Sequence, residues 1–417
     1  MSAISTRSFT VNNRAYQPPA SPVVVVCLDG SADEYLDSAM AAGRMPNLQR
    51  MSVTGYRGRA RGAMPSFTNV NNASIVTGVP PSVHGIGGNY FFDASSGAEV
   101  MMNSAGFLRC ETIFPAAARA GREVAVVTAK EKLRDIFASG LIGEGGIAFS
   151  SEKANQAKKD THGIQSVEQL VGRPTPPIYS GDASLYVLWS GVALLQKGMA
   201  DFLYLSTTDY MQHKFAPGAR EVIEFYAAID VELGRLMDLG AVIGLTADHG
   251  MNAKQRSDGT PNVIYLESLL TKKFGSGFRV ILPITDPYVV HHGALGSFAV
   301  IHLPPKQSLE PVRDWLMDLS GVTEVYDRAT AARKLELPTD RLGELVVISG
   351  RDVVLGRTPD YHDLKALEGG LRSHGGRYEE MVPFVLSRPL KPEYVGKAAG
   401  DPRNFDIFDF TCNGTVA

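Results

Sequence analysis

The sequence predicts an α/β protein in which helices flank a mostly parallel sheet and a smaller α+β unit is inserted as a cap. Short apolar runs rich in β-branched residues recur along the chain, and helix-like segments separate them. The pattern changes in the second half, where strand-like runs crowd together between prolines. Because strands that alternate with helices favour a doubly wound parallel sheet, we expect that architecture for the larger part of the chain.

Four apolar runs are expected to be the buried parallel strands of this sheet. Each is bounded by polar residues or glycine, as is typical of a strand covered on both faces. They lie at residues 23–28, 123–128, 202–206 and 241–246, with helices expected at residues 38–51, 184–197 and 219–239. Ligands of such sheets bind beyond the carboxyl ends of the strands, so the polar residues that follow these runs are candidates for a site.

The inserted unit is expected at residues 258–368. Strands at residues 298–303, 324–327 and 344–348 and a helix at 309–319 are expected within it. The chain then returns to the core with a final strand at residues 382–386. We therefore predict a discontinuous metal-binding catalytic core, residues 20–257 and 369–410, and a cap domain, residues 258–368.

The composition excludes several classes of protein. Of the 417 residues, 44 % are hydrophobic and 20 % are charged, and the charges sum to 41 − 44 = −3. This balance offers no basic surface for nucleic acid or an acidic membrane. The three scattered cysteines form no disulfide framework, and the first 20 residues contain no apolar leader. We expect a cytoplasmic protein without nucleic-acid or membrane partners. Whether two chains form a homodimer is left open by the sequence.

Aspartates and histidines at expected strand ends and glycine turns form a candidate metal site. Carboxylates and imidazoles together suit Zn²⁺ or Mn²⁺ better than Mg²⁺. The candidates are Asp29, Asp209, His213, Asp248, His249 and His374. Alone, each has a structural explanation: a strand-end aspartate often caps a helix, and an Asp–His pair four residues apart is often a solvated helix face. Because one sheet edge would collect all of them, the metal site is favoured.

The segment 64–89 carries the strongest single signal. Pro65 and Ser66 predict a turn, and Thr68 then opens a helix that runs to about residue 76. A hydroxyl at a helix N-terminus lies among backbone N–H groups and at the positive end of the dipole, where a phosphate-like anion binds. The alternative is that Ser66 or Thr68 serves only as the helix N-cap.

These motifs and their order along the chain resemble those of the alkaline phosphatase superfamily, in its nucleotide pyrophosphatase/phosphodiesterase-like branch. The resemblance covers residues 23–390 and includes the TG-x-x-P-x-x-HGI stretch at 77–86. It implies an alkaline-phosphatase-like core that binds two zinc ions. One zinc would be held by Asp209, His213 and His374, and the other by Asp29, Asp248, His249 and the Thr68 oxygen. Thr68 would be the nucleophile that forms a phosphothreonine, and Asn89 would donate to a phosphoryl oxygen.

Within this branch, the phrase PSFTN-x-NN-x-SIVTG and the lysines of TAKEK are similar to members that hydrolyse phosphonoacetate. That likeness implies cleavage of a C–P bond to acetate and phosphate. Carbon leaves phosphorus without redox chemistry only as a stabilised carbanion, and a cation on a neighbouring carboxylate provides that stabilisation. In an extended segment, Lys130 and Lys132 would face the same side and bind this carboxylate. The alternative is a solvated surface pair around Glu131.

Other activities of the superfamily remain as alternatives. A phosphodiesterase or phosphomonoesterase would use the same core, and a phosphonate-binding protein would keep the site without turnover. The C-x-P-x-R motif of sulfatases is absent, and Asn69 and Val70 stand where nucleotide-type members often have Phe-Pro. Four further polar residues are set aside because a lone His or Tyr is usually structural. They are Tyr210, Lys214, His291 and His292.

Overall fold

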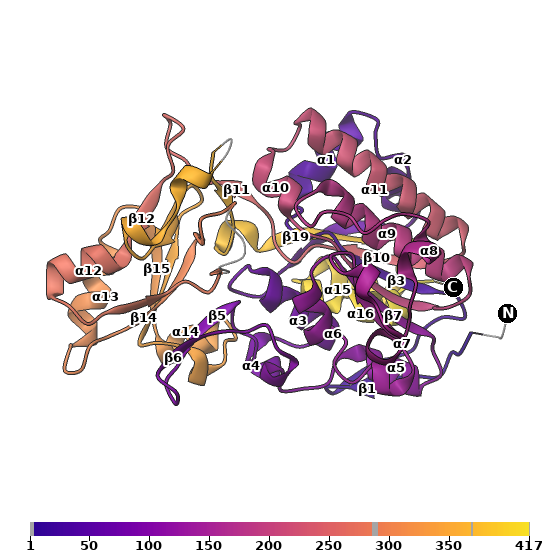
Figure 1. Cartoon of the computed structure of the whole chain (residues 1–417), viewed down its shortest axis with the longest axis horizontal. Coiled ribbons are helices and arrows are strands. Elements are labelled where there is room, and N and C mark those ends of the chain that lie inside the picture. Colours follow the sequence, from indigo (N-terminus) through magenta and orange to yellow (C-terminus); the bar gives the residue numbers. More distant parts are fainter. Residues whose placement is uncertain (1–3, 286–290, 368–369, 417) are drawn as a thin grey trace.

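The computed structural model describes residues 4–285, 291–367 and 370–416. Figure 1 shows a larger part around a seven-stranded sheet and, beside it, a smaller part around a four-stranded sheet. This arrangement confirms the predicted α/β fold class with a smaller α+β unit. The domain boundaries at residues 257 and 368 remain a prediction, and the second lies outside the described residues.

The large sheet has the strand order β4-β19-β10-β3-β9-β7-β8. The four expected runs form the strands at its centre, and every residue of these strands is buried. They are β3 (Val23–Cys27), β7 (Val124–Thr128), β9 (Phe202–Ser206) and β10 (Val242–Thr246). Adjacent members of the series β10-β3-β9-β7-β8 are parallel, with β8 (Ile147–Ser150) at the edge. The carboxyl ends of these strands therefore meet at one edge of the sheet.

One strand of the large sheet runs against the others. The final strand, β19 (Met381–Leu386), lies antiparallel between β10 and β4 (Tyr56–Arg61). The sheet is therefore mostly parallel, as predicted. β4 and β8 were not predicted, because β4 reads YRGRAR without an apolar run and β8 has only four residues.

Helices cover both faces of the large sheet (Figure 1). Alternate residues of β3 pack into two different cores: Val24 and Val26 on one face, Val23 and Val25 on the other. The first core is closed by α1 (Asp33–Ala41), α2 (Pro46–Thr54), α9 (Gly181–Gln196) and α11 (Arg220–Asp238). The second is closed by α3 (Thr68–Thr77), α5 (Ile113–Arg119), α6 (Glu131–Phe137) and α16 (Ile407–Asp409). No helix of the described ranges is long and apolar enough to cross a membrane.

The single helix predicted at residues 38–51 is wrong, because the chain forms α1 and α2 with a break between them. Gly43 adopts φ +69° there, which a right-handed helix does not allow. Pro46 then occupies the first turn of α2, the position in a helix that proline tolerates best. The periodic pattern continued across the break, so the break was visible only in these two residues.

The smaller part is an antiparallel sheet of order β13-β14-β16-β15 with helices packed against it. Its strands are β13 (Arg279–Ile281), β14 (Phe298–His302), β16 (Leu345–Ser349) and β15 (Val322–Asp327). Its helices are α12 (Leu266–Phe274), α13 (Leu309–Met317) and α14 (Arg328–Lys334). Its apolar core also contains Phe67 and Val70, so it is continuous with the start of α3.

Short elements connect the two sheets or lie at their margins. The helices are α4 (Pro81–His84), α7 (Lys159–His162), α8 (Val167–Val171), α10 (Tyr210–Lys214) and α15 (Pro392–Ala399). Four two-stranded ladders pair β1 (Phe9–Val11) with β2 (Arg14–Tyr16), β5 (Tyr90–Asp93) with β6 (Ala98–Met101), β11 (Asn252–Ala253) with β18 (Arg372–Ser373), and β12 (Val263–Tyr265) with β17 (Val354–Gly356). The β11–β18 ladder joins the segment after β10 to the segment that carries His374.

Gly55 provides a test of the packing of α2 against β19. A Cβ atom at this position would lie 2.0 Å from the Leu386 carbonyl oxygen and 2.9 Å from the Ser387 carbonyl carbon. Because both are backbone atoms, Gly55→Ala should lower the free energy of unfolding by about 1–3 kcal/mol in urea denaturation. Gly396→Ala, in α15, is the control, since no atom lies within 4 Å of its Cβ position. Equal stability of both variants would contradict the close packing.

Candidate active site

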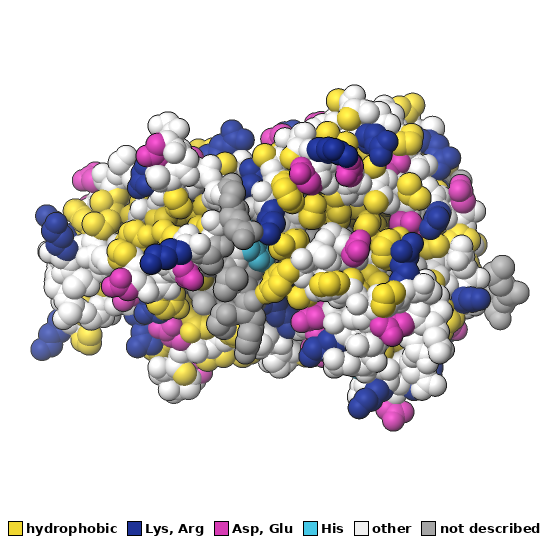
Figure 2. All heavy atoms as spheres, turned by 45° about the horizontal axis from the view of Figure 1, so that its top comes forward, with side chains coloured by type: hydrophobic (Ala, Val, Ile, Leu, Met, Phe, Trp, Pro, Cys, Tyr) yellow, Lys and Arg dark blue, Asp and Glu magenta, His cyan; other side chains and the backbone are white. Residues whose placement is uncertain are grey.

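The carboxyl ends of four neighbouring strands bring the candidate residues to one edge of the sheet. Asp29 follows β3, Lys130 follows β7, and Asp209 follows β9. Asp248 and His249 follow β10. Figure 2 shows histidine atoms at the surface in the hollow between the larger and the smaller part. The site therefore lies where a parallel sheet presents its ligands.

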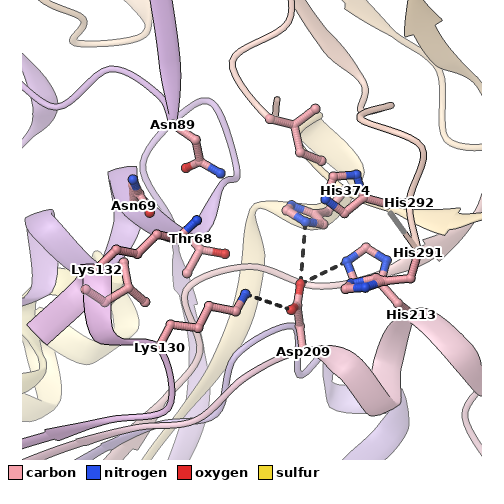
Figure 3. A pocket seen from close by; sticks show the side chains of 12 residues that line it. Thr68, Asn69, Asn89, Lys130, Lys132, Asp209, His213, His291, His292 and His374 are labelled. Carbon is pink, nitrogen blue, oxygen red and sulfur yellow. Dashed lines mark ion pairs between the residues drawn. The ribbon is translucent and has the colours of Figure 1, made fainter. Parts of the chain in front are cut away.

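A first cluster forms around Asp209. Asp209 precedes α10, and His213 lies one turn further along that helix, so Asp209 Oδ2 is 3.0 Å from His213 Nε2. His374 reaches the same oxygen at 3.7 Å, and Lys130 Nζ lies 3.6 Å from Asp209 Oδ1 (Figure 3). Burial acts to raise the pKa of Asp209, but His213 and Lys130 hold it well below its usual value.

A second cluster forms around His249. Its Nε2 atom lies 3.3 Å from Asp29 Oδ1, 3.8 Å from Asp248 Oδ2 and 3.2 Å from Thr68 Oγ1. Burial, together with the negative charges of Asp209 and Asp248, raises the pKa of Asp29. Burial opposes protonation of His249, but Asp248 and Asp29 raise its pKa to about 10. Three buried carboxylates, Asp29, Asp209 and Asp248, therefore act on this point, and a bound cation would offset their charge.

Two stacked histidine rings, one from each cluster, join the two clusters. The rings of His249 and His374 stack with their centroids 3.6 Å apart and their planes at 7°. Asp209, His249 and His374 also place ligand atoms within 4.8 Å of one another, as do the members of the set Asp29, Asp248 and His249. The candidate ligands therefore form one continuous site.

The donor atoms fit divalent metal ions. The Nδ1 atoms of His213, His249 and His374 contact backbone carbonyl oxygens at 2.7, 2.9 and 2.7 Å. When Nδ1–H donates to such a carbonyl, Nε2 is free to bind a metal. Metal-binding histidines usually make this second contact. Both carboxylate oxygens of Asp29 are buried, and their contact among the described residues is His249 Nε2, 3.3 Å from Oδ1. A buried carboxylate with so few hydrogen-bond donors is costly unless a cation also binds it.

Thr68 lies at the first position of α3, and neither it nor Ser66 caps the helix. The N-cap is Phe67, without a side-chain cap, and the Ser66 hydroxyl donates to the Gly376 carbonyl. The alternative interpretation of these hydroxyls as a helix cap is therefore wrong. Thr68 Oγ1 faces His249 instead, and only 7 % of the residue is exposed.

The pocket at this edge is lined by Thr68, Asn89, Lys130 and Lys132 together with the first cluster (Figure 3). The Oδ1 atom of Asn89 is buried and has no partner within the described part of the chain. The expected extended conformation of the lysine segment is wrong, because Lys130 precedes α6 and Lys132 lies in its first turn. Both lysines line the pocket nonetheless, since the first turn of α6 faces it.

Some residues of the site were not predicted. Asn69 also lines the pocket, as do His291 and His292, for which the sequence favoured a structural role. A ring nitrogen of His291 lies within 4.8 Å of ligand atoms of Asp209 and His213, so these three residues could hold a metal ion. Asn72 donates to Asp248 Oδ2 at 2.9 Å, while its own Oδ1 accepts from the Tyr204 hydroxyl at 2.6 Å. The three asparagines among residues 69–72 were the available signal for Asn72.

Comparisons with known proteins agree with this arrangement. Residues 23–376 match the family model of type I phosphodiesterase / nucleotide pyrophosphatase. A crystal structure of phosphonoacetate hydrolase from Sinorhizobium meliloti, in complex with phosphonoacetate, is 48 % identical with a TM-score of 0.94. It covers 99 % of this chain and 100 % of that one. Murine ectonucleotide pyrophosphatase/phosphodiesterase 5 is 17 % identical with a TM-score of 0.58, covers 94 % of both chains and shares the fold.

Other relatives match only part of the chain. Venom phosphodiesterase of Naja atra is 26 % identical over 242 residues, which are 56 % of this chain and 26 % of that protein. Murine ectonucleotide pyrophosphatase/phosphodiesterase family member 1 is 25 % identical over 248 residues, or 55 % of this chain and 24 % of the relative. The matched segment therefore spans about a quarter of the length of these curated relatives.

Proposed function

Since the chain belongs to the type I phosphodiesterase / nucleotide pyrophosphatase family and, within it, to the phosphonoacetate hydrolases, we propose that it cleaves the C–P bond of phosphonoacetate. The products are acetate and phosphate. The observation that carries this proposal is the lining of one pocket by Thr68, the first candidate metal cluster and two lysines. Such a pocket can hold a phosphonate at one end and a carboxylate at the other.

Two zinc ions are proposed as the metals. Asp209, His213 and His374 would hold one, and Asp29, Asp248, His249 and the Thr68 oxygen the other. Zinc bound by these residues would lower the pKa of the Thr68 hydroxyl and offset charge on the phosphoryl oxygens. Asn72 keeps Asp248 in place by its hydrogen bond to Oδ2, and the backbone N–H groups of Gly30 and His249 donate to Oδ1.

Thr68 is proposed as the nucleophile. The hydroxyl gives its proton to solvent water, its Oγ1 forms a bond to phosphorus while the P–C bond breaks, and the electron pair of that bond stays with carbon. Water then hydrolyses the resulting phosphothreonine and regenerates the hydroxyl. Asn89 is proposed to donate its amide N–H to a phosphoryl oxygen. The Oδ1 atom of the same side chain is buried and has no partner among the residues described.

The lysines are proposed to make the carbon a competent leaving group. As the P–C bond breaks, negative charge spreads from carbon onto the neighbouring carboxylate to give an enolate of acetate. Lys130 and Lys132 line the pocket beside this position, so their ammonium groups stabilise the charge as it arrives. The leaving group then takes a proton from water and departs as acetate.

Metal content tests the first part of the proposal. Elemental analysis should find two zinc equivalents per chain, and removal of the metal with a chelator should abolish phosphate release until zinc is restored. Asp29→Asn should retain only one equivalent, because Asp29 belongs to the second cluster alone. Full activity in a preparation shown to be free of metal would contradict the proposal.

The role of Thr68 is tested by two substitutions. Thr68→Ala should lower kcat for phosphonoacetate by roughly a thousandfold or more, while Thr68→Ser keeps part of the activity. Thr77→Ala is the control on the same helix, since that hydroxyl donates to the Ala73 and Ser74 carbonyls and does not line the pocket of Thr68. Near-normal turnover by Thr68→Ala would mean that water attacks directly.

Binding of phosphonoacetate without any turnover by the parent chain would indicate a binding protein.

The lysines are tested by comparing two substrates. Lys130→Ala and Lys132→Ala should each lower kcat/KM for phosphonoacetate more than about tenfold, or about 1.4 kcal/mol. The loss should be much smaller for nitrophenyl phosphate, which has no carboxylate. Lys153→Ala is the control, because Lys153 lines the adjoining groove with both lysines but not the pocket of Thr68. If the lysine variants kept the parent's rates on both substrates, and the parent preferred nitrophenyl diesters, the results would favour phosphodiesterase activity instead.

A further inference from the structure

A buried ion pair joins the two loops that carry His249 and His374. Lys254 Nζ lies 2.9 Å from Glu379 Oε1, and both side chains are 0 % exposed. The ammonium group also donates to Ser297 Oγ at 2.8 Å and to the Arg351 carbonyl oxygen at 2.7 Å. All three ammonium protons are therefore used, and the charge has a fixed position.

Glu379 contacts both loops directly. Its Oε2 accepts from the N–H of Gly376, two residues after His374, at 3.0 Å. Its backbone carbonyl accepts from the N–H of Gly250, the residue after His249, at 2.8 Å. Its Oε1 also accepts from Asn252 Nδ2 at 2.6 Å. One residue thus fixes the backbone beside two candidate ligands that are far apart in the sequence.

The partners of Lys254 connect this arrangement to the smaller part of the molecule. Ser297 directly precedes β14, and its N–H donates to the His374 carbonyl at 2.9 Å. The backbone N–H of Lys254 donates to the carbonyl of Leu371, three residues before His374. The ion pair therefore lies where the segment after β10, the start of β14 and the His374 loop meet.

Stability alone does not explain such a pair. Removing two charges from water costs about as much as their attraction returns, and apolar replacements of similar volume are often neutral or stabilising. Metal sites, in contrast, depend on ligand positions within about 0.2 Å. The pair acts on the backbone beside the stacked rings of His249 and His374, which belong to different candidate clusters.

We propose that Lys254 and Glu379 are positioning residues that set the distance between the two halves of the metal site. Neither residue is placed among the ligands or in contact with substrate. The inference rests on the proposed metal site, because it assigns the pair a role in holding that site in its binding geometry. Loss of the pair should therefore change metal binding and the metal's coordination, and not only the stability of the fold.

Cobalt binding provides the test. Apo protein of the full chain is titrated with Co²⁺, and the dissociation constants and the visible absorption spectrum are recorded beside urea unfolding. Lys254→Met leaves Glu379 buried without its cation and should weaken cobalt binding about tenfold or more with a changed spectrum. Lys254→Met/Glu379→Gln removes both charges, should recover most of the stability and should keep the weakened binding. If the single variant does not fold, the double variant decides.

Arg122→Met is the matched control. The Arg122 side chain is 0 % exposed and pairs with Asp201 at 2.6 Å, but it precedes β7, at the end of the sheet remote from the site. This variant should lose stability and keep parent-like cobalt binding. A folded double variant with the parent's affinity and spectrum would overturn the positioning role. A parent chain that binds no cobalt would instead overturn the metal site of the proposed function, and this inference with it.

Discussion

Three buried carboxylates lie at one edge of the sheet, and the surrounding structure holds them together against their mutual repulsion. Burial and then the charges of Asp209 and Asp248 raise the pKa of Asp29, so the three groups act on one another. The parallel strands enforce this proximity, because the aspartates follow the carboxyl ends of three adjacent strands, β10, β3 and β9. Histidines, a lysine and backbone N–H groups then surround the carboxylates with positive charge or hydrogen-bond donors.

The smaller part of the molecule contributes to the same site through packing. Phe67, the residue before Thr68, packs edge-on against the His374 ring and against Phe298 of β14, at centroid distances of 5.5 and 6.4 Å. A Cβ on Gly375 would lie 2.3 Å from the Phe67 ring, so the loop after His374 approaches it as closely as glycine permits. The start of α3, a candidate ligand and the smaller sheet are therefore packed as one unit.

The sequence predicted the elements whose signal is local. The apolar runs of β3, β7, β9 and β10 are continuous, and an aspartate placed directly after such a run can be located without a structure. The division between α1 and α2 was missed because the apolar periodicity continues across Gly43 and Pro46. The conformation of Lys130 and Lys132 was missed because only Ala129 and Lys130 separate β7 from α6, so Lys132 already lies in the helix.

Other features depend on partners that are remote along the chain. Asn72 has a role only because Asp248 and Tyr204 meet it across the sheet, and Lys254 is satisfied by residues from three separate segments. A single sequence does not show which residues such polar side chains will meet, since the partners lie in distant segments of the chain. Buried polar networks of this kind are therefore revealed by the fold and not by a motif.

The position of β19 has a consequence for the order in which the protein forms during synthesis. β19 is the last strand of the large sheet along the chain, yet it lies between β10 and β4. Until the ribosome has released residues 381–386, β10 has an unpaired apolar edge and β4 has no neighbour in the sheet. An exposed strand edge invites pairing with other chains. A nascent chain that stalls after β10 would thus be prone to aggregation, and would also lack His374.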